Sequence, residues 1–176
     1  MDSPRFVRGG ATPADGGRTS EVEPQMQAMV GDFGEPGAPV AIIAATREER
    51  MTMEDAGREL TTRGIDYELH ELSPHRNPLV LARFVDTAPI RGIRVIIATA
   101  GTVPSLPALV ASLTEIPVIG VPLSTTALNG MDTLMATAQA APGTPVACMC
   151  VDGIRNSAIF ASKILTAIPL APGDGE

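Results

Sequence analysis

Short apolar runs alternate along the chain with longer stretches in which hydrophobic and polar positions are mixed. The clearest run, Val40-Ala-Ile-Ile-Ala-Ala45, carries no polar side chain. A strand that is apolar at every position is typical of a parallel sheet, because helices cover both of its faces. The predicted strands cover residues 40–45, 67–72, 95–98, 117–121 and 145–151.

The mixed stretches between these strands have helical composition and helix-end signals. Pro78 stands near the start of one stretch, and Gly64 follows the end of another, where a C-cap favours glycine. The predicted helices cover residues 48–63, 78–88, 106–113, 128–138 and 156–167. Five strand–helix units in series predict an α/β fold: a three-layer, doubly wound parallel sheet of about five strands, Rossmann-like or flavodoxin-like.

The two ends of the chain lack this pattern. Residues 1–38 are rich in Gly, Pro and charged side chains, so they cannot bury enough apolar surface to offset the entropy of ordering. We predict a flexible N-terminal tail over 1–38, one α/β domain over 39–170 and a flexible C-terminus over 171–176. No apolar run approaches the length of about 20 residues that a membrane helix needs, and no secretory signal is recognisable. We therefore expect a cytoplasmic protein without a membrane partner.

Composition and charge narrow the partners. The 176 residues include 13 basic and 20 acidic side chains, with a net charge of −7, and one Tyr, four Phe and no Trp. Proteins that bind nucleic acid neutralise phosphates with basic side chains and stack bases on aromatic ones, so no nucleic-acid partner is expected. Cys148 and Cys150 lack the further ligands that a metal site requires, and we predict that both are buried thiols.

Ligands of doubly wound sheets bind beyond the carboxyl ends of the strands, so the loops that follow the strands are the candidates for chemistry. After the first strand, Thr46 precedes Glu49 by three positions. This spacing predicts a helix capping box, or an anion contact that uses the Thr46 hydroxyl and free amides. The loop over residues 99–107 is rich in small side chains, which let a ligand approach the backbone.

The most informative loop follows the second strand and reads Ser73-Pro-His75-Arg76-Asn-Pro78. Arg76 offers a fork of donors for phosphate or carboxylate, Ser73 adds a hydroxyl, and the proton of an imidazole such as His75 moves near neutral pH. The alternative interpretation is a surface turn with incidental polar side chains. His70 lies within the predicted strand and is interpreted as structural.

Other catalytic motifs are lacking in the sequence. The chain contains no G-x-G-x-x-G or P-loop motif, no G-x-S-x-G turn and no H-E-x-x-H pair. Dinucleotide binding, Walker-type nucleotide hydrolysis, serine hydrolysis and metal-dependent hydrolysis thus lose support. The chemistry that remains is proton transfer by one histidine beside a bound anion.

Several of these segments together resemble one enzyme family. Ser73-Pro-His-Arg-Asn-Pro78 resembles the motif S-A-H-R-T-P, and Val95-Ile-Ile-Ala-Thr-Ala-Gly101 resembles V-I-I-A-G-A-G. Pro117-Val-Ile-Gly-Val-Pro122 and Ala127-Leu-Asn-Gly130 resemble P-V-L-G-V-P and A-L-S-G. From about Val40 to Leu165 the chain resembles the PurE family, the N5-carboxyaminoimidazole ribonucleotide mutases and aminoimidazole ribonucleotide carboxylases of purine biosynthesis.

The resemblance implies carboxyl transfer on an aminoimidazole ribonucleotide, by a mutase or a carboxylase/decarboxylase, with carbon dioxide and without metal or organic cofactor. It also implies a homo-octamer with active sites between subunits. His75 would be the general acid and base, and Arg76 with Ser73 would hold the 5′-phosphate. Thr46 and Glu49 stand at the family's first active-site serine and its ribose-contacting aspartate. The base and carbon dioxide pocket would be lined by Ala100, Gly101 and Thr102, with Ser105 close by.

Departures from the family pattern leave alternatives open. The family's G-S-x-S-D reads Ala45-Thr-Arg-Glu-Glu49, and its histidine before Leu-Pro is Ser105. One alternative is a paralogue that acts on a different heteroaromatic nucleotide or acid, and another is a non-catalytic ligand-binding scaffold. The related nicotinate-nucleotide carboxylases need a cysteine at the site, whereas Cys148 and Cys150 lie in the predicted last strand.

Overall fold

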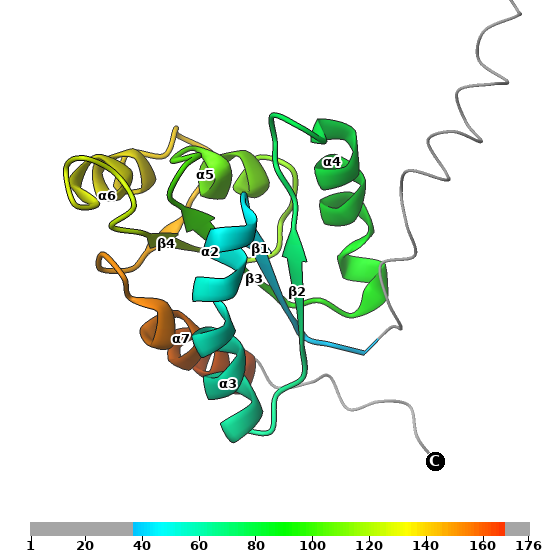
Figure 1. The fold of residues 1–176 in the computed structure, drawn as a ribbon. Helices are drawn as coiled ribbons and strands as arrows, with labels where there is room; N and C mark the ends of the chain where they lie inside the picture. Colours follow the sequence, from blue (N-terminus) through cyan, green and yellow to red (C-terminus); the bar gives the residue numbers. More distant parts are fainter. Residues whose placement is uncertain (1–36, 168–176) are drawn as a thin grey trace, which may run out of the picture. The chain divides into compact units, whose positions relative to one another are not determined.

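A computed structural model describes residues 37–167 of the chain. The predicted tails, 1–38 and 171–176, lie outside these residues except for positions 37 and 38. The described part contains a five-stranded, all-parallel sheet with the strand order β2-β1-β3-β4-β5 (Figure 1). Its strands are β1 (Val40–Ala44), β2 (Tyr67–Glu71), β3 (Val95–Ala100), β4 (Val118–Pro122) and β5 (Ala147–Cys148). The prediction of a doubly wound parallel sheet is confirmed, and the strand order is the flavodoxin-like one.

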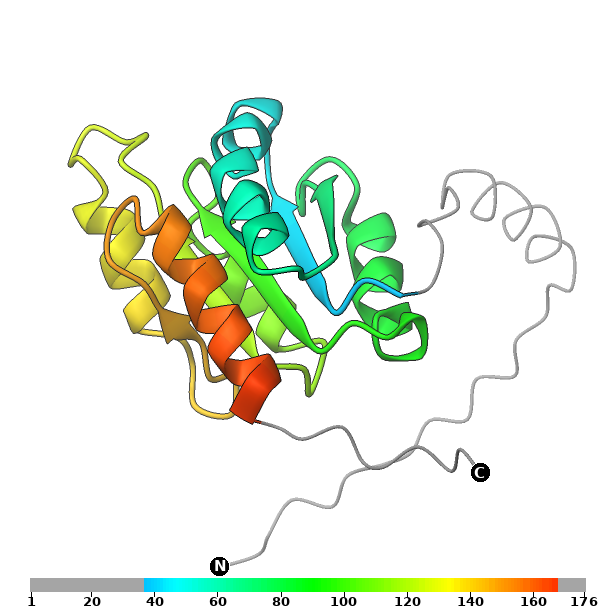
Figure 2. The same cartoon turned by 90° about the horizontal axis from the view of Figure 1, so that it is seen from below.

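Helices connect successive strands and cover both faces of the sheet. They are α2 (Arg47–Thr52), α3 (Glu54–Thr62), α4 (Pro78–Thr87), η1 (Pro89–Arg91), α5 (Leu106–Ala111), α6 (Met131–Ala138) and α7 (Ile154–Ala167). Helices α4, α5 and α6 lie on one face, and α3 and α7 lie side by side on the other (Figures 1 and 2). Among residues 37–167, no helix has the length and apolar character needed to cross a membrane.

Three predicted elements differ from the structure by more than two residues at one end or in their number. The helix expected over 48–63 is two helices that meet at Met53, whose side chain is fully buried. Helix α6 begins at Met131 rather than Leu128, because Gly130 before it has a left-handed backbone with φ of 84° and cannot continue a helix upstream.

The fifth strand is much shorter than the seven residues predicted. Only Ala147 and Cys148 pair with β4, and the chain then turns through Asp152, whose φ is 54°. Cys148 is half-buried and Cys150 is exposed, so the expectation of two buried thiols is wrong for Cys150. Burial, with a smaller contribution from Cys150, raises the pKa of the Cys148 thiol above its usual value.

The core consists of two hydrophobic layers that the sheet separates. Alternate residues of each strand point into one layer or the other: Ile43 and Ile96 pack beneath α4 and α5, whereas Ile42 and Ile97 pack beneath α3 and α7. All four side chains are completely buried. Burial on both faces is the physical reason why the strands read as continuous apolar runs.

One histidine belongs to a polar cluster at the edge strand β2. Glu68 accepts from Arg91 Nη1 at 2.6 Å and lies 3.0 Å from His70 Nε2. The Arg91 guanidinium lies 4.3 Å above the Phe84 ring, which also contacts the imidazole. Burial lowers the pKa of His70, and hydrogen bonding to Glu68 opposes that shift. These contacts fasten β2 to α4 and η1 and favour the structural interpretation of His70.

Gly120 in β4 allows α5 and α6 to approach the sheet closely. A Cβ atom at this position would fall against Thr137 Cγ2 of α6 and would lie 2.9 Å from Val146 Cγ1 and 3.2 Å from Pro107 Cβ. We expect Gly120→Ala to lower the free energy of unfolding by about 1–3 kcal/mol, because overpacking displaces well-packed neighbours. Urea titration of the two proteins measures this difference.

A rescue variant separates this steric explanation from a change in strand propensity. Thr137→Ser removes Cγ2 but keeps the hydroxyl that donates to the Thr133 carbonyl oxygen at 2.8 Å. The double variant should therefore recover most of the stability that Gly120→Ala loses. If the double variant Gly120→Ala/Thr137→Ser lost as much free energy of unfolding as the two single variants added together, the close-packing argument would be contradicted.

Candidate functional site at the carboxyl edge of the sheet

The loops after β1, β2 and β3 meet where the strand order reverses, between β1 and β3. The strands β1 and β2 pair up to Ala44 and Glu71, so their following loops start side by side. From the loop after β2, Arg76 Nη2 donates to the Ala45 carbonyl oxygen at 3.2 Å. This edge of a doubly wound sheet is where ligands bind, and nearly all the predicted site residues lie in these three loops.

Glu49 joins the loop after β1 to the end of β3 and the loop that follows. Its carboxylate is 1% exposed and accepts three hydrogen bonds: from Ala45 N at 3.2 Å, Thr99 Oγ1 at 2.5 Å and Thr102 N at 2.7 Å. A carboxylate can be buried at this depth because donors surround both of its oxygens. In this arrangement the carboxylate faces the protein interior rather than a ligand.

Thr46 is the N-cap of α2, as the sequence predicts. Its hydroxyl oxygen accepts from Glu49 N at 3.3 Å. A complete capping box would return the Glu49 carboxylate to the Thr46 amide. The carboxylate instead reaches the amide one residue earlier, at Ala45, and crosses to the loop after β3. The capping prediction is therefore correct for Thr46 and incomplete for Glu49.

The loop after β2 presents Arg76 and His75 at the surface. Ser73 is buried, and its hydroxyl oxygen accepts from Arg76 N at 3.3 Å, which fixes the turn. The Arg76 guanidinium donates from Nη2 to Glu71 Oε1 at 2.6 Å as well as to Ala45. His75 is exposed, and no hydrogen bond within the described residues fixes its ring. The structure thus places Ser73, His75 and Arg76 together in one loop at the carboxyl edge.

The loop after β3 adjoins the loop after β1, because Thr102 N donates to Glu49. Ala100 and Gly101 are buried, whereas Thr102 and Ser105 are exposed. A Cβ atom on Gly101 would lie 2.6 Å from Glu49 Oε1 and 3.0 Å from Thr125 Oγ1, so only glycine fits between these groups. Ser105 stands at the N-cap of α5, but its side chain makes no capping hydrogen bond.

Acidic groups accompany the basic ones at this edge. A backbone amide and the Thr46 hydroxyl lower the pKa of the Glu48 carboxyl, and the charges of Arg47 and Arg76 lower it further. Glu48 thus lies within the electrostatic reach of both guanidiniums. Glu71 contacts Arg76 directly, so carboxylates lie beside the guanidinium to which the resemblance assigns the phosphate. Within residues 37–167, no three His, Cys, Asp or Glu side chains are grouped as a metal site would need.

Two contributors to this site were not predicted from the sequence. Thr99 lies in a strand that is otherwise apolar, and a polar residue at the end of a buried strand is a signal that could have indicated it. Glu71 precedes Arg76 by five positions at the end of β2. Its signal was weaker, because acidic residues are common at strand ends and the pairing depends on how the loop turns.

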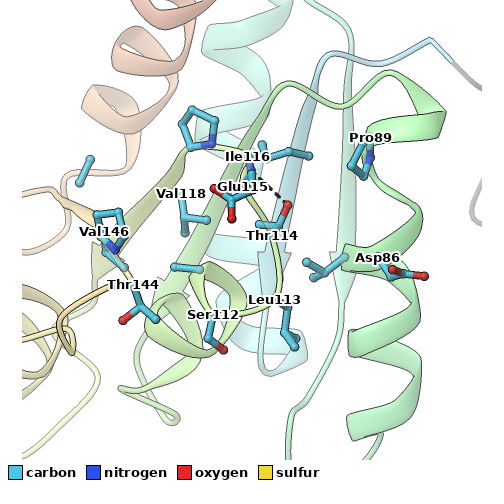
Figure 3. Close-up of a pocket in the computed structure, with 16 residues that line it drawn as sticks. Asp86, Pro89, Ser112, Leu113, Thr114, Glu115, Ile116, Val118, Thr144 and Val146 are labelled. Atoms are coloured by element: carbon cyan, nitrogen blue, oxygen red, sulfur yellow. Dashed lines mark hydrogen bonds between the residues drawn. The ribbon is translucent and has the colours of Figure 1, made fainter.

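A groove lies at the opposite edge of the sheet from these loops. This groove, with a volume of about 950 Å³, is bounded by the end of α5, the start of β4 and the segment before β5 (Figure 3). Its polar side chains include Asp86, Ser112, Thr114, Glu115 and Thr144, and no basic residue or histidine lines it. The groove contains none of the predicted site residues and no group suited to proton transfer near neutral pH. We therefore place the candidate active site at the carboxyl edge and not in this groove.

The fold and this site together define a class of protein. The class is that of the flavodoxin-like α/β proteins, here with an imidazole, a guanidinium and small-residue loops at the carboxyl edge of the sheet. Residues 39–169 match the AIR carboxylase family. The chain belongs to this family, which confirms the PurE resemblance of its motifs.

Individual relatives agree with that assignment. The N5-carboxyaminoimidazole ribonucleotide mutase of Pyrococcus abyssi is 44% identical over 127 residues, which span 72% of this chain and 73% of the relative. The mutase of Thermotoga maritima is 42% identical over 126 residues, covering 72% and 74%. The phosphoribosylaminoimidazole carboxylase of Schizosaccharomyces pombe is 40% identical over 126 residues, 72% of this chain and 23% of that protein. PurE from Treponema denticola superposes with a TM-score of 0.63 at 16% identity over 74% of this chain and 81% of that one, which supports the fold.

The three hydrogen bonds to Glu49 generate a prediction for stability. In Glu49→Gln the side chain keeps its size, but one carboxylate oxygen becomes an NH2 group. This NH2 group cannot accept a hydrogen bond and must face at least one of the three donors. We expect the free energy of unfolding to fall by about 1–3 kcal/mol, the usual cost of an unsatisfied buried polar group. Glu48→Gln, an exposed neighbour, is the matched control and should change stability much less. Equal stability of Glu49→Gln and the wild type in urea would contradict a structural role for this carboxylate.

Proposed function

We propose that this chain catalyses carboxyl transfer on an aminoimidazole ribonucleotide or a close analogue, as a mutase or as a carboxylase/decarboxylase. The observation that carries the proposal is the position of the Ser73-x-His75-Arg76 loop, which Arg76 fastens to Ala45 at the switch point. Family membership and relatives named as mutases or carboxylases of the aminoimidazole ribonucleotide support the same reaction class.

In the proposed mechanism His75 moves one proton between two atoms of the substrate. As the N–C bond of an N-carboxylated substrate breaks, carbon dioxide leaves and the imidazolium gives a proton to the nitrogen. The nucleophilic ring carbon then attacks carbon dioxide, a C–C bond forms, and the neutral imidazole removes the proton from that carbon. Protons and electrons balance in this sequence of steps without a cofactor. The side chain of His75 is exposed, so its imidazole is accessible to a ligand.

The proposed binding roles follow the positions of the loops. Arg76 and Ser73 would contact the phosphate, with Thr46 beside them, and Glu49 stands at the position of the family's ribose contact. Ala100, Gly101 and Thr102 would line the pocket for the base and carbon dioxide. Ser105 would meet the substrate carboxylate with a hydroxyl where the family has an imidazole, since no capping bond occupies its side chain. Because a hydroxyl is a weaker carboxylate partner than a charged imidazole, this position favours the paralogue as the second candidate.

We further propose that the protein is a cytoplasmic homo-octamer with active sites between subunits. Exposed large apolar side chains on several helices support self-association, among them Leu109 of α5, Met131 and Met135 of α6 and Phe160 of α7. Surfaces of this kind mark protein interfaces when they are contiguous. Light scattering coupled to size-exclusion chromatography should give the mass of eight chains. The mass of a single chain would contradict the proposal.

The two histidines of the chain provide a matched pair for the activity test. We expect His75→Asn to lower kcat by about 10²–10⁴-fold, the usual contribution of a general acid or base, while substrate still binds. His70→Gln, at the structural cluster on β2, should keep its turnover. Carboxylation and decarboxylation are followed by ultraviolet absorbance with aminoimidazole ribonucleotide and its two carboxylated isomers.

Other outcomes distinguish the alternatives. Full activity of His75→Asn would contradict the proton-transfer role. Failure of the folded wild type to turn over any of the three purine substrates would contradict the purine assignment. Activity that appears only in Ser105→His would instead support the paralogue with a different natural substrate. Binding of ligand without turnover of any kind would support the non-catalytic scaffold.

A further inference from the structure

The guanidinium of Arg76 is already engaged in the free protein. Its Nη2 donates both to Glu71 Oε1 at 2.6 Å and to the Ala45 carbonyl oxygen at 3.2 Å. A guanidinium can grip an anion with two parallel N–H bonds through either of two forks, Nε with Nη2 or Nη1 with Nη2. Nη2 belongs to both forks. While its two hydrogens are used internally, Arg76 can offer an incoming phosphate only single N–H bonds.

Other donors at this edge have internal acidic partners too. The Glu49 carboxylate accepts from the amides of Ala45 and Thr102, and Glu48 lies within electrostatic reach of Arg47 and Arg76. A phosphate that approaches Arg76 therefore meets neighbouring carboxylates, and it gains a two-bond grip only if it displaces Glu71 or Ala45 from Nη2. Of the three carboxylates, Glu71 is the one in direct contact with Arg76.

We propose that Glu71 is a specificity-determining residue that competes with the substrate's phosphate for Arg76. The inference rests on the proposed function, because it assumes that Arg76 receives the phosphate. Its consequence is a site with reduced preference for a nucleotide over the corresponding unphosphorylated riboside. A riboside has no anionic group to exchange with Glu71, so the Glu71–Arg76 pair can remain intact when it binds.

The test replaces the competing carboxylate by its neutral isostere. Glu71→Gln should tighten the binding of aminoimidazole ribonucleotide by about three- to tenfold, a modest change because the Arg76 and Glu71 side chains are 61% and 31% exposed. The affinity for aminoimidazole riboside should stay the same. Calorimetric dissociation constants for both ligands give the result without reference to turnover, and the tightening should shrink as salt is raised.

A double-mutant cycle assigns the effect to the contact itself. In an Arg76→Gln background, Glu71→Gln should no longer change nucleotide binding by more than the residual effect of one distant charge. Glu115→Gln at the opposite edge of the sheet controls for the change in net charge and should bind both ligands like the wild type. Circular dichroism verifies that each variant is folded.

The contrary results are equally definite. Weaker nucleotide binding by Glu71→Gln would overturn the proposal, because it would show that Glu71 holds Arg76 in place for the ligand. Unchanged binding, equal tightening of riboside binding, or no nucleotide binding by either protein would overturn it as well. Failure of the proposed carboxyl transfer shows itself separately, as nucleotide binding without turnover in the wild type.

Discussion

The carboxylate of Glu49 is the constraint on which the candidate site depends. It is almost completely buried and located where the strand order reverses, so its polar oxygens require hydrogen bonds from the segments around them. Ala45 and Thr102 supply backbone amides and Thr99 supplies a hydroxyl. The loops after β1 and β3 are consequently held together before any ligand arrives, and the space left beside Gly101 admits no side chain.

This arrangement separates the sheet into two edges with different properties. At the carboxyl edge, guanidinium, imidazole, carboxylate and amide groups lie close together in loops that buried hydrogen bonds hold. At the opposite edge, the groove is lined by apolar side chains, hydroxyls and two acidic residues. Chemistry selects the carboxyl edge, because proton transfer and anion binding need groups such as an imidazole and a guanidinium, and neither lines the groove.

The architecture was predictable from the sequence because its main signal is local. Continuous apolar runs such as that around Ile42 and Ile43 reflect burial on both faces of the sheet, and the strand–helix alternation restricts the topology. The errors occurred where local signal is weak. Pairing of β5 depends on a single neighbouring strand, and the start of α6 depends on the left-handed backbone of Gly130.

The position of the candidate site's loops was predictable, but the contacts of its side chains were not. Motif positions indicated Ser73, His75 and Arg76, and the structure places all three in the loop after β2, at the carboxyl edge of the sheet. The partners of the charged groups depend on side chains that come from separate strands: Thr99 reaches Glu49 across 50 positions of sequence. The pattern of hydrophobic and polar positions does not predict such a pairing. The inward orientation of Glu49 and the contact between Arg76 and Glu71 are therefore seen only in the three-dimensional structure.

The charges at the carboxyl edge also explain how an acidic protein could discriminate among anionic ligands. A lone guanidinium on such a surface would attract any phosphate, since electrostatic attraction is unselective. When a cation already has an internal carboxylate partner, as Arg76 has in Glu71, a ligand gains only the free-energy difference between its own contacts and those it replaces, and that difference depends on the geometry of both. Under the proposed competition, the engagement of Arg76 by Glu71 and the use of the Ala45 and Thr102 amides by Glu49 act in the same direction. They would lower the affinity gained from charge alone, so that recognition would depend more on the fit of the ligand to the three loops.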